Sequence, residues 1–253
     1  MNSYYILTLF PEIFHVYFNI GLAKKGLEKG LFNVNVINIR DFAKNKFKKV
    51  DDYPFGGSSG LVLQVQPIID AIDYVEQACP GVVCFYPSPR GEVIKQKKLC
   101  EISQKFDKIC FLCGHYKGID ERVFKLKKIK EISVGDYVLN SGEVATIVLL
   151  DGLLRLIPGF IGNEKCIMED SISSRLLESP NYTKPREIFG EVVPDVLLSG
   201  HHKNIRFWQL KESFKRTVKS KPYLILGRNF DKCEKAAYAQ AKEEILKELY
   251  SGG

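Results

Sequence analysis

The apolar residues of the chain alternate between short continuous runs and longer stretches with helical spacing. The continuous runs predict strands at positions 4–10, 82–86 and 109–113, and an alternating apolar pattern predicts another strand at 32–39. Between these runs, apolar residues three or four positions apart predict helices that begin near Pro11, Pro67 and Gln96. Strands that alternate with helices in this way predict an α/β domain with a parallel sheet.

Three turns in this domain are candidates for a ligand site. The run 109–113 ends at Gly114, and a second run, 137–139, which we expect to be a strand, is closed by residues 140–142. A third turn, 87–91, contains two prolines and follows the run 82–86. Turns with little side-chain cover let main-chain N–H and C=O groups reach a ligand, so we expect the three to line one pocket. Glycine at strand ends is common in α/β domains, and alone it is weak evidence.

From Glu143 to Ile157 the chain is apolar at nearly every position, which predicts a buried helix. Arg155 is the only basic residue of this stretch, and a buried guanidinium needs a polar partner. Taken alone, an Arg at such a place is more often a half-exposed capping side chain than a catalytic one.

The residues after 158 predict a second domain. Glycine and polar residues at 159–169 show little periodicity, which is typical of a linker. Beyond it, helical spacing predicts helices around 207–218 and 232–250, and we expect no strand of any length. The predicted organisation is therefore an α/β domain at 1–161, a linker at 162–172 and a small all-helical domain at 173–253.

The net charge of +7 favours an anionic partner, although many proteins of similar charge bind no nucleic acid. Basic residues gather at 40–49 and at 203–221, where Glu212 is the single acid among seven Lys and Arg residues. A charged run usually forms a solvated face, but this one-sided balance favours contact with an RNA backbone. The predicted RNA contacts are Lys49, Lys203, Arg206, Lys211, Lys215 and Arg216.

Several common kinds of site do not fit the sequence. The glycines at 56, 57 and 60 are not followed by the Lys and Ser or Thr of a phosphate-binding loop. Cys110 and Cys113 lie in one predicted strand, where residues three apart face opposite ways, so we expect no metal site there. The seven cysteines are scattered, mostly in apolar segments, which predicts reduced thiols in a cytoplasmic protein. We also expect no leader peptide and no membrane span, which needs ~20 apolar residues.

The order of several short motifs is more specific than any of these features. Residues 113–122 read CGHYKGIDER, 133–143 read SVGDYVLNSGE and 151–159 read DGLLRLIPG. LTLFPEIF at 7–14, VDDYPFGG at 50–57, YPSPRG at 86–91, EDS at 169–171 and VPDVLLSGHH at 193–202 complete the series. Together, over essentially the whole chain, these motifs resemble the bacterial tRNA (guanine-N1)-methyltransferases, the TrmD-like members of the SPOUT superfamily.

The resemblance implies a fold, a cofactor and partners. Members of this family are homodimers whose N-terminal domain contains a deep trefoil knot, and they transfer a methyl group from S-adenosyl-L-methionine to tRNA. The acceptor is N1 of the guanosine at position 37, just 3′ of the anticodon. The donor-binding residues implied for this chain lie in the three turns described above: Tyr86, Pro87, Ser88, Pro89, Gly114, Tyr116, Gly118, Val134, Gly135, Tyr137, Leu139, Ser141 and Gly142.

The resemblance also implies a catalytic pair, Asp170 as general base and Arg155 as the residue that orients it and polarises the guanine O6. N1 carries a proton in the neutral base, and a carboxylate with a pKa near ~3.9 is a weak base, so charge on O6 must be stabilised. From the residues alone, Asp170 is only a linker carboxylate or a helix cap. No metal ligands are apparent in the sequence, although the family implies Mg²⁺ dependence.

This chain departs from the family pattern at four positions: His115, Lys117, Ser141 and Ala145 stand where many members have Arg, Glu, Gly and Pro. Lys117 removes or reverses any contact that a carboxylate there makes with the donor. Two alternatives therefore stay open: a tRNA-binding protein that has lost catalysis, and a knotted methyltransferase acting on ribose 2′-O or on another RNA site.

Overall fold

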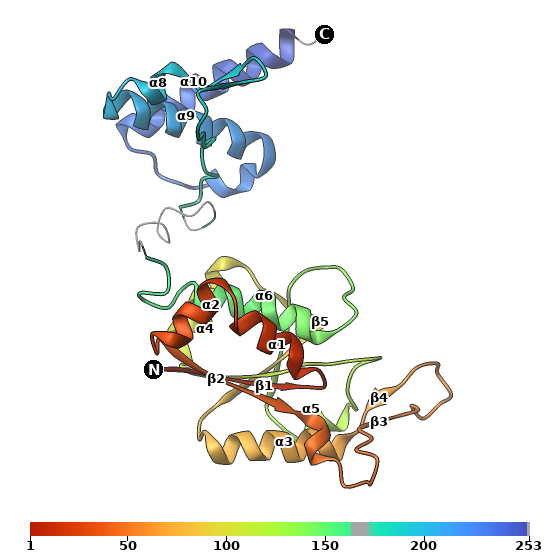
Figure 1. Cartoon of the computed structure of the whole chain (residues 1–253). Coiled ribbons are helices and arrows are strands. Elements are labelled where there is room, and N and C mark those ends of the chain that lie inside the picture. Colours follow the sequence, from red (N-terminus) through yellow and green to blue (C-terminus); the bar gives the residue numbers. More distant parts are fainter. Residues whose placement is uncertain (163–171, 173, 252–253) are drawn as a thin grey trace. The chain divides into compact units, whose positions relative to one another are not determined.

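The computed structural model describes residues 1–162, 172 and 174–251 (Figure 1). The chain forms two compact units, residues 1–164 and 165–253. Each unit has a hydrophobic core of its own.

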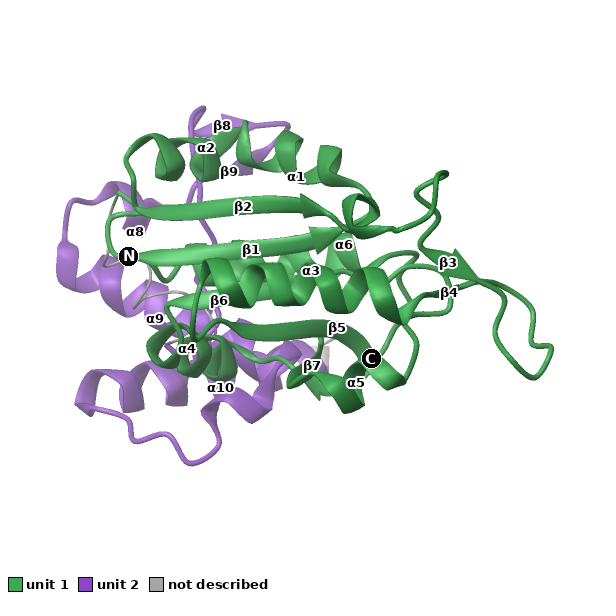
Figure 2. Ribbon diagram, turned by 90° about the horizontal axis from the view of Figure 1, so that it is seen from below, with its two compact units in different colours: residues 1–164 green, residues 165–253 purple. Residues whose placement is uncertain are grey.

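The first unit is built on a five-stranded parallel sheet with the order β2-β1-β6-β5-β7 (Figure 2). Its strands are β1 (Asn2–Thr8), β2 (Phe32–Asn38), β5 (Val83–Val93), β6 (Lys108–Leu112) and β7 (Ile129–Ser133). In the central strands, Ile6 pairs with both Val36 and Phe111. Because every strand runs the same way, all carboxyl ends lie at one edge, where open α/β sheets bind ligands.

Helices cover both faces of this sheet (Figure 1). One core holds residues of α1 (Pro11–Phe18), α2 (Gly21–Glu28), α4 (Gln96–Lys105) and α6 (Gly142–Leu154). The other holds residues of α3 (Val65–Ala78), α5 (Arg122–Leu126) and the 3-10 helix η1 (Ile39–Phe42). Cys110 and Cys113 belong to opposite cores, as the alternation along the strand predicts. The predicted α/β fold with a parallel central sheet is confirmed.

Three local predictions in the first unit are wrong. Residues 137–139 form an exposed loop and no strand. The strand of this region is β7, where the charged residues Lys130 and Glu131 interrupt the apolar pattern that would predict a strand. β7 is an edge strand, so it tolerates polar residues on its outer positions. The turn 87–91 lies inside β5, where Pro87 and Glu92 both pair with Ile132 and the residues between them bulge out.

The third difference concerns α6, which the sequence predicts to be buried all round. Seven of its residues are buried, but Val144 and Val148 are 44% and 53% exposed. They are spaced i, i+4 and so share one stripe of the helix. α6 packs one face on the sheet, and in this chain its outer stripe stays uncovered.

The second unit contains α8 (Asp195–Leu198), α9 (His202–Ser220), the 3-10 helix η2 (Pro222–Ile225) and α10 (Lys232–Ser251). Its core is formed by Leu176, Phe214, Ala237 and Ala241. Its described residues also include a two-residue antiparallel pair, β8 (Glu187–Ile188) and β9 (Glu191–Val192), which the all-helical prediction lacks. Phe189 and Gly190, both with positive φ, make the tight turn that this hairpin requires.

Candidate active site

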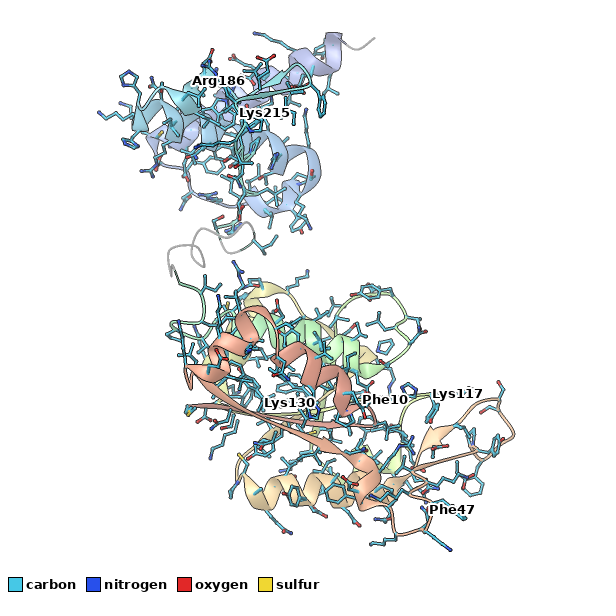
Figure 3. All side chains as sticks on the ribbon, viewed as in Figure 1. Phe10, Phe47, Lys117, Lys130, Arg186 and Lys215 are labelled. Atoms are coloured by element: carbon cyan, nitrogen blue, oxygen red, sulfur yellow. The ribbon has the colours of Figure 1, made fainter. Side chains whose placement is uncertain are left out.

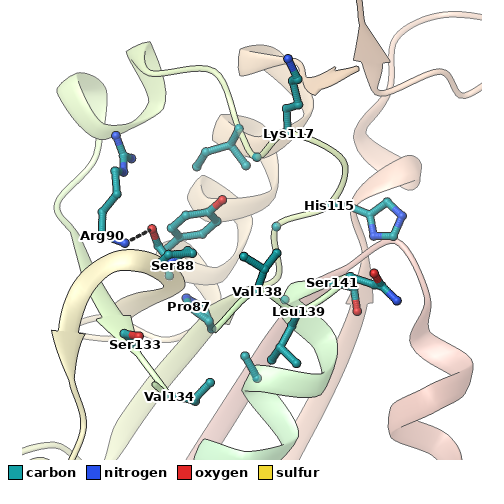
Figure 4. Close-up of a pocket in the computed structure, with 18 of the residues that line it drawn as sticks. Pro87, Ser88, Arg90, His115, Lys117, Ser133, Val134, Val138, Leu139 and Ser141 are labelled. Carbon is teal, nitrogen blue, oxygen red and sulfur yellow. Dashed lines mark hydrogen bonds between the residues drawn. The ribbon is translucent and has the colours of Figure 1, made fainter. Parts of the chain in front are cut away.

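A cavity of about 450 Å³ opens at the carboxyl ends of β5, β6 and β7 (Figure 4). Three loops supply most of its wall: residues 86–90, 114–119 and 133–142. Glu121, Phe124 and Ala145 complete it. All residues that the sequence analysis assigned to donor binding lie in this wall: Tyr86, Pro87, Ser88, Pro89, Gly114, Tyr116, Gly118, Val134, Gly135, Tyr137, Leu139, Ser141 and Gly142.

The first loop is the bulge of β5, and Arg90 fastens it. The Arg90 guanidinium lies 3.1 Å from the Glu121 carboxylate and 2.7 Å from the Glu131 carboxylate, and it packs over the ring of Phe124. The hydrogen bond to Glu121, with help from Glu131, raises the pKa of Arg90 above its usual value. The main-chain N–H of Arg90 also donates to Ser88 Oγ at 3.1 Å (Figure 4). These contacts tie the bulge to α5 and to β7.

The second loop begins at Gly114, directly under the ring of Tyr86. A Cβ atom at Gly114 would lie 2.5 Å from Tyr86 Oη, so no larger residue fits while Tyr86 stays in place. Tyr86 is buried and packs edge-on against Phe124. Burial raises the pKa of Tyr86 to about 12, so this phenol stays protonated at neutral pH.

The third loop closes onto the second through main-chain atoms. The N–H of Gly142 donates to the C=O of Gly114 at 2.8 Å, and a Cβ atom at Gly142 would lie 2.6 Å from the Gly114 nitrogen. Only Gly fits there, because backbone cannot move aside as a side chain can. The neighbouring Ser141 has an extended backbone (φ −154°, ψ 155°) that any residue adopts. Ser is therefore compatible with the position where many family members have Gly.

A buried polar contact holds α6 beneath the cavity. Thr8, at the end of β1, is 0% exposed and donates to Glu143 Oε1 at 2.7 Å, and Glu143 is 1% exposed. The Thr8 hydroxyl also accepts a hydrogen bond from the Phe10 N–H at 2.9 Å. Nearby, burial and then the charge of Glu143 raise the pKa of Cys113 well above its usual value. This thiol is therefore neutral and chemically inert.

Of the two predicted catalytic residues, only Arg155 is described by the structure, and it does not line the cavity. Arg155 is half-buried at the C-terminal end of α6, whereas Gly142, at the other end, lines the cavity. Thirteen positions separate them, which is ~20 Å along a helix. Arg155 is not among the lining residues. Asp170 lies outside the described residues.

The predicted RNA-binding residues fall into three groups. Lys211 and Lys215 lie 2.7 Å and 3.0 Å from the carboxylate of Glu244, with most of each side chain covered, so they stabilise α9 against α10. Lys49 pairs with Asp52 at 3.3 Å, and Arg216 donates to the main-chain oxygen of Glu178. Lys203 and Arg206 are exposed.

Sequence reasoning missed several residues of the site. Arg90 and Phe124 hold the first loop in place. Arg90 could have been singled out from its position in the motif YPSPRG, whereas no motif pointed to Phe124. Thr8 and Glu143 are 135 positions apart, so no local pattern could pair them.

Within residues 1–162, 172 and 174–251, no group of three His, Cys, Asp or Glu side chains is placed to hold a metal ion. None of the helices in the described ranges is both long enough and apolar enough to cross a bilayer. The cavity offers main-chain hydrogen-bonding groups between apolar walls, which suits a small, flat, partly polar ligand.

Residues 3–227 match a family model described as tRNA (Guanine-1)-methyltransferase TrmD. A protein of Clostridium tetani is 46% identical over 227 residues, covering 90% of this chain and 93% of the relative. A protein of Syntrophomonas wolfei is 45% identical over 241 residues, covering 95% and 96%. A protein of Bacillus cereus is 45% identical over 242 residues, covering 94% and 98%. Each of these relatives is named tRNA (guanine-N(1)-)-methyltransferase.

Proposed function

The chain belongs to the tRNA (guanine-1)-methyltransferase family TrmD, and from that premise we propose how it methylates tRNA at N1 of guanine: at which position, from which donor and with which residues. We propose that the target is the guanosine at position 37, 3′ of the anticodon. The observation that carries the proposal is the cavity whose wall contains every predicted donor-binding residue.

We propose S-adenosyl-L-methionine as the methyl donor in this cavity. Three features support the fit: apolar walls at Val134 and Leu139, two loops held close together at Gly114 and Gly142, and a volume within the ~300–1,000 Å³ of small-molecule sites. When bound, the donor supplies a methyl carbon made electrophilic by its sulfonium. The loops of the chain hold and orient the donor, and Tyr86, neutral at pH 7, packs over Gly114 without adding charge.

For the acceptor we propose that Asp170 removes the N1 proton while Arg155 orients Asp170 and stabilises negative charge on the guanine O6. A guanidinium is protonated at any working pH and presents its N–H groups in a planar fork. It therefore suits an oxygen on which charge develops during proton loss. Positioned acid–base catalysis of this kind contributes ~10² to 10⁴-fold to a rate.

We propose that the enzyme is a homodimer in which Arg155 of one subunit serves the cavity of the other. Two observations support this: Arg155 and the cavity lie at opposite ends of α6, and α6 carries the exposed apolar stripe of Val144 and Val148. A helix with apolar residues all round is normally buried, so a second subunit is a natural cover for the stripe. We further propose a trefoil knot in the first unit, as the family resemblance implies.

Within this proposal, residues 1–161 bind the donor, 162–172 form the linker and 173–253 bind tRNA. Lys49, Lys203, Arg206 and Arg216 are the proposed phosphate contacts, while Lys211 and Lys215 support them by fixing α9 on α10. A cytoplasmic location, where tRNA is available, belongs to the same proposal. Mg²⁺ dependence stays a prediction, since the described residues offer it no ligand cluster, and no step is derived through it.

The test supplies purified enzyme with methyl-labelled S-adenosyl-L-methionine and a tRNA transcript carrying G or A at position 37. We expect 1-methylguanosine only with G. Asp170→Asn and Arg155→Lys should lower kcat ~10² to 10⁴-fold and leave donor affinity within about twofold. Mixing the two inactive variants should restore part of the activity, because a mixed dimer contains one intact pair.

Other outcomes would select the alternatives. Donor and tRNA binding without transfer would identify a tRNA-binding protein that has lost catalysis. A label on ribose 2′-O or at another site would identify a different methyltransferase. Full activity of Asp170→Asn would remove Asp170 from the mechanism.

A further inference from the structure

Residues 43–61, which we call the arm, extend from one end of the first unit (Figure 2). Its base is the antiparallel pair β3 (Asp51–Asp52) and β4 (Val62–Leu63). Three rings of the arm face solvent: Phe47 is 88% exposed, Tyr53 77% and Phe55 99%. Phe47 lies at the same end of the unit as Lys117 (Figure 3). So much exposed aromatic surface within nine residues is unusual for a chain that folds to bury apolar groups.

The arm is a built element with its own contacts. The Asn45 side chain accepts from the Lys49 N–H at 2.8 Å and donates to the Lys49 C=O at 2.6 Å. Val50 and Leu63 are fully buried at the base, and the Gln64 N–H donates to the Val50 C=O at 2.8 Å. The aliphatic side chains at the base are covered while the rings are open to solvent. The exposure of the rings is therefore set by the fold of the arm.

The base of the arm is joined to the second loop of the cavity. The N–H of Lys117 donates to the C=O of Leu61, and the N–H of Leu63 donates to the C=O of Gly118, both at 3.0 Å. The aliphatic part of Lys117 lies on Gly60, where an added Cβ would come within 3.3 Å of it. The arm therefore lies next to the cavity, where a polymer that presents a base to the cavity can reach it.

The charge of the arm distinguishes between the partners that exposed rings could serve. The arm, residues 43–61, contains four Lys against two Asp. Lys44, Lys48 and Lys49 form ion pairs at the surface, which are weak and leave the excess positive field in place. Every strongly exposed apolar side chain of the arm is aromatic, whereas the exposed stripe of α6 is aliphatic. Interleaved rings and lysines are the combination that binds single-stranded nucleic acid, because bases stack on rings and phosphates meet lysines.

We propose that Phe47, Tyr53 and Phe55 form a stacking surface for unpaired bases of the tRNA anticodon loop. The inference rests on the proposed function, since it is the target guanine in the cavity that brings the loop to the arm. Stacking of a base on a ring tolerates any base but requires an aromatic face. The arm thus contributes affinity for the loop and no choice between base sequences.

The test uses a pair of substitutions at Phe55 in the full-length protein. Leu keeps an apolar side chain but removes the flat face, whereas Trp keeps the face. We expect Phe55→Leu to weaken binding of a 17-nucleotide anticodon stem-loop about 5- to 100-fold and to raise the tRNA KM similarly. Donor affinity should stay unchanged. Phe55→Trp in a Trp208→Phe background should recover most of the RNA affinity, and its emission should be quenched by the stem-loop.

Three results would overturn the inference. The first is equal RNA affinity of the parent and Phe55→Leu. The second is an indole emission of the Phe55→Trp variant that RNA does not change. The third is a loss of dimer, measured by sedimentation, that tracks the loss of RNA affinity in both variants, since the arm would then contact a second copy. If instead the parent protein methylates no tRNA while Phe55→Leu still loses the stem-loop, the proposed function fails and the stacking surface stands.

Discussion

The contact between Thr8 and Glu143 gives the sharpest stability prediction. Thr8→Val keeps the shape of the side chain and removes its hydroxyl, so Glu143 Oε1 loses its donor and the Phe10 N–H loses its acceptor. The other oxygen of this carboxylate, Oε2, already has no hydrogen-bond partner among the described residues. The variant therefore leaves the carboxylate buried without a hydrogen bond from the part of the chain that the structure describes.

The magnitude follows from the two bonds that are lost. A hydrogen bond to a charged group contributes ~1.5–3 kcal/mol and a neutral one ~1 kcal/mol, so Thr8→Val should destabilise the first unit by about 3 kcal/mol. For a unit of this size, 1 kcal/mol shifts Tm by ~2–4 °C, so we expect a fall of roughly 6–12 °C. Because the contact anchors the third loop, donor affinity should fall as well.

Thr146→Val is the matched control. Thr146 is also fully buried in the same unit, but among the described residues its hydroxyl meets only the sulfur of Cys113, at 3.3 Å. Sulfur is a weak hydrogen-bonding partner, so we expect a cost of less than ~1 kcal/mol.

Calorimetry of the full chain measures the transition of the first unit, while emission of Trp208, the single Trp, reports the second unit as a reference. A double-mutant cycle that combines Thr8→Val with Glu143→Gln measures the interaction free energy between Thr8 and Glu143. Equal losses for Thr8→Val and Thr146→Val would refute the reasoning.

Three further predictions follow from other contacts. Gly142→Ala places a Cβ 2.6 Å from a main-chain nitrogen, so it should raise the donor Kd, measured by titration calorimetry, at least ~10-fold. In the control Gly152→Ala, the added Cβ meets the movable end of the Leu99 side chain, so the donor Kd should stay near the parent value. Equal Kd values for the two variants would contradict the close approach of the third loop to Gly114. Burial tends to raise the pKa of Glu244, but hydrogen bonds from Lys211 and Lys215 outweigh this effect, and the pKa is lowered. Glu244 therefore stabilises the packing of α9 on α10 at pH values above its unfolded pKa of ~4.3, and this stabilisation is lost as the pH falls. Urea midpoints from Trp208 emission between pH 3 and 6 should therefore fall less steeply with acid in Glu244→Gln than in the parent, and identical profiles would count against the pairing. Lys203→Gln should reduce the slope of the logarithm of the tRNA-binding constant against the logarithm of salt concentration by ~1. Lys211→Gln should leave this slope unchanged and lower the urea midpoint of the second unit. The reverse pattern would show that Lys211, and not Lys203, contacts phosphate.

Much of the first unit could be predicted from the sequence because its interior strands have continuous apolar runs. β1, β5 and β6 are interior strands with residues in both cores, and their runs are found where the pattern indicates. β7 escapes the pattern because it lies at the sheet edge, where Lys130 can extend over the ring of Phe106 instead of leaving the strand. Residues 137–139 resemble a strand in sequence because their side chains are apolar, although those side chains line a cavity.

The candidate site was predictable in its loops and less so in its supports. Gly114 and Gly142 mark close approaches of main chain, and such positions leave a clear signal in a sequence. The pairs Thr8–Glu143 and Arg90–Glu131 join distant segments, and no periodicity reports them. The distance of Arg155 from the cavity could be inferred from the sequence, because a helix of known rise separates Arg155 from Gly142 by ~20 Å.

The two outer walls of the cavity respond differently to the surrounding medium. The bulge of β5 is held largely by the exposed ion pairs of Arg90, which dissolved ions screen. The joint between Gly142 and Gly114 is a neutral main-chain bond, which dissolved ions hardly affect. Raising the ionic strength therefore loosens one side of the cavity and leaves the other in place, so a ligand escapes past the bulge, and its residence time shortens as salt is added.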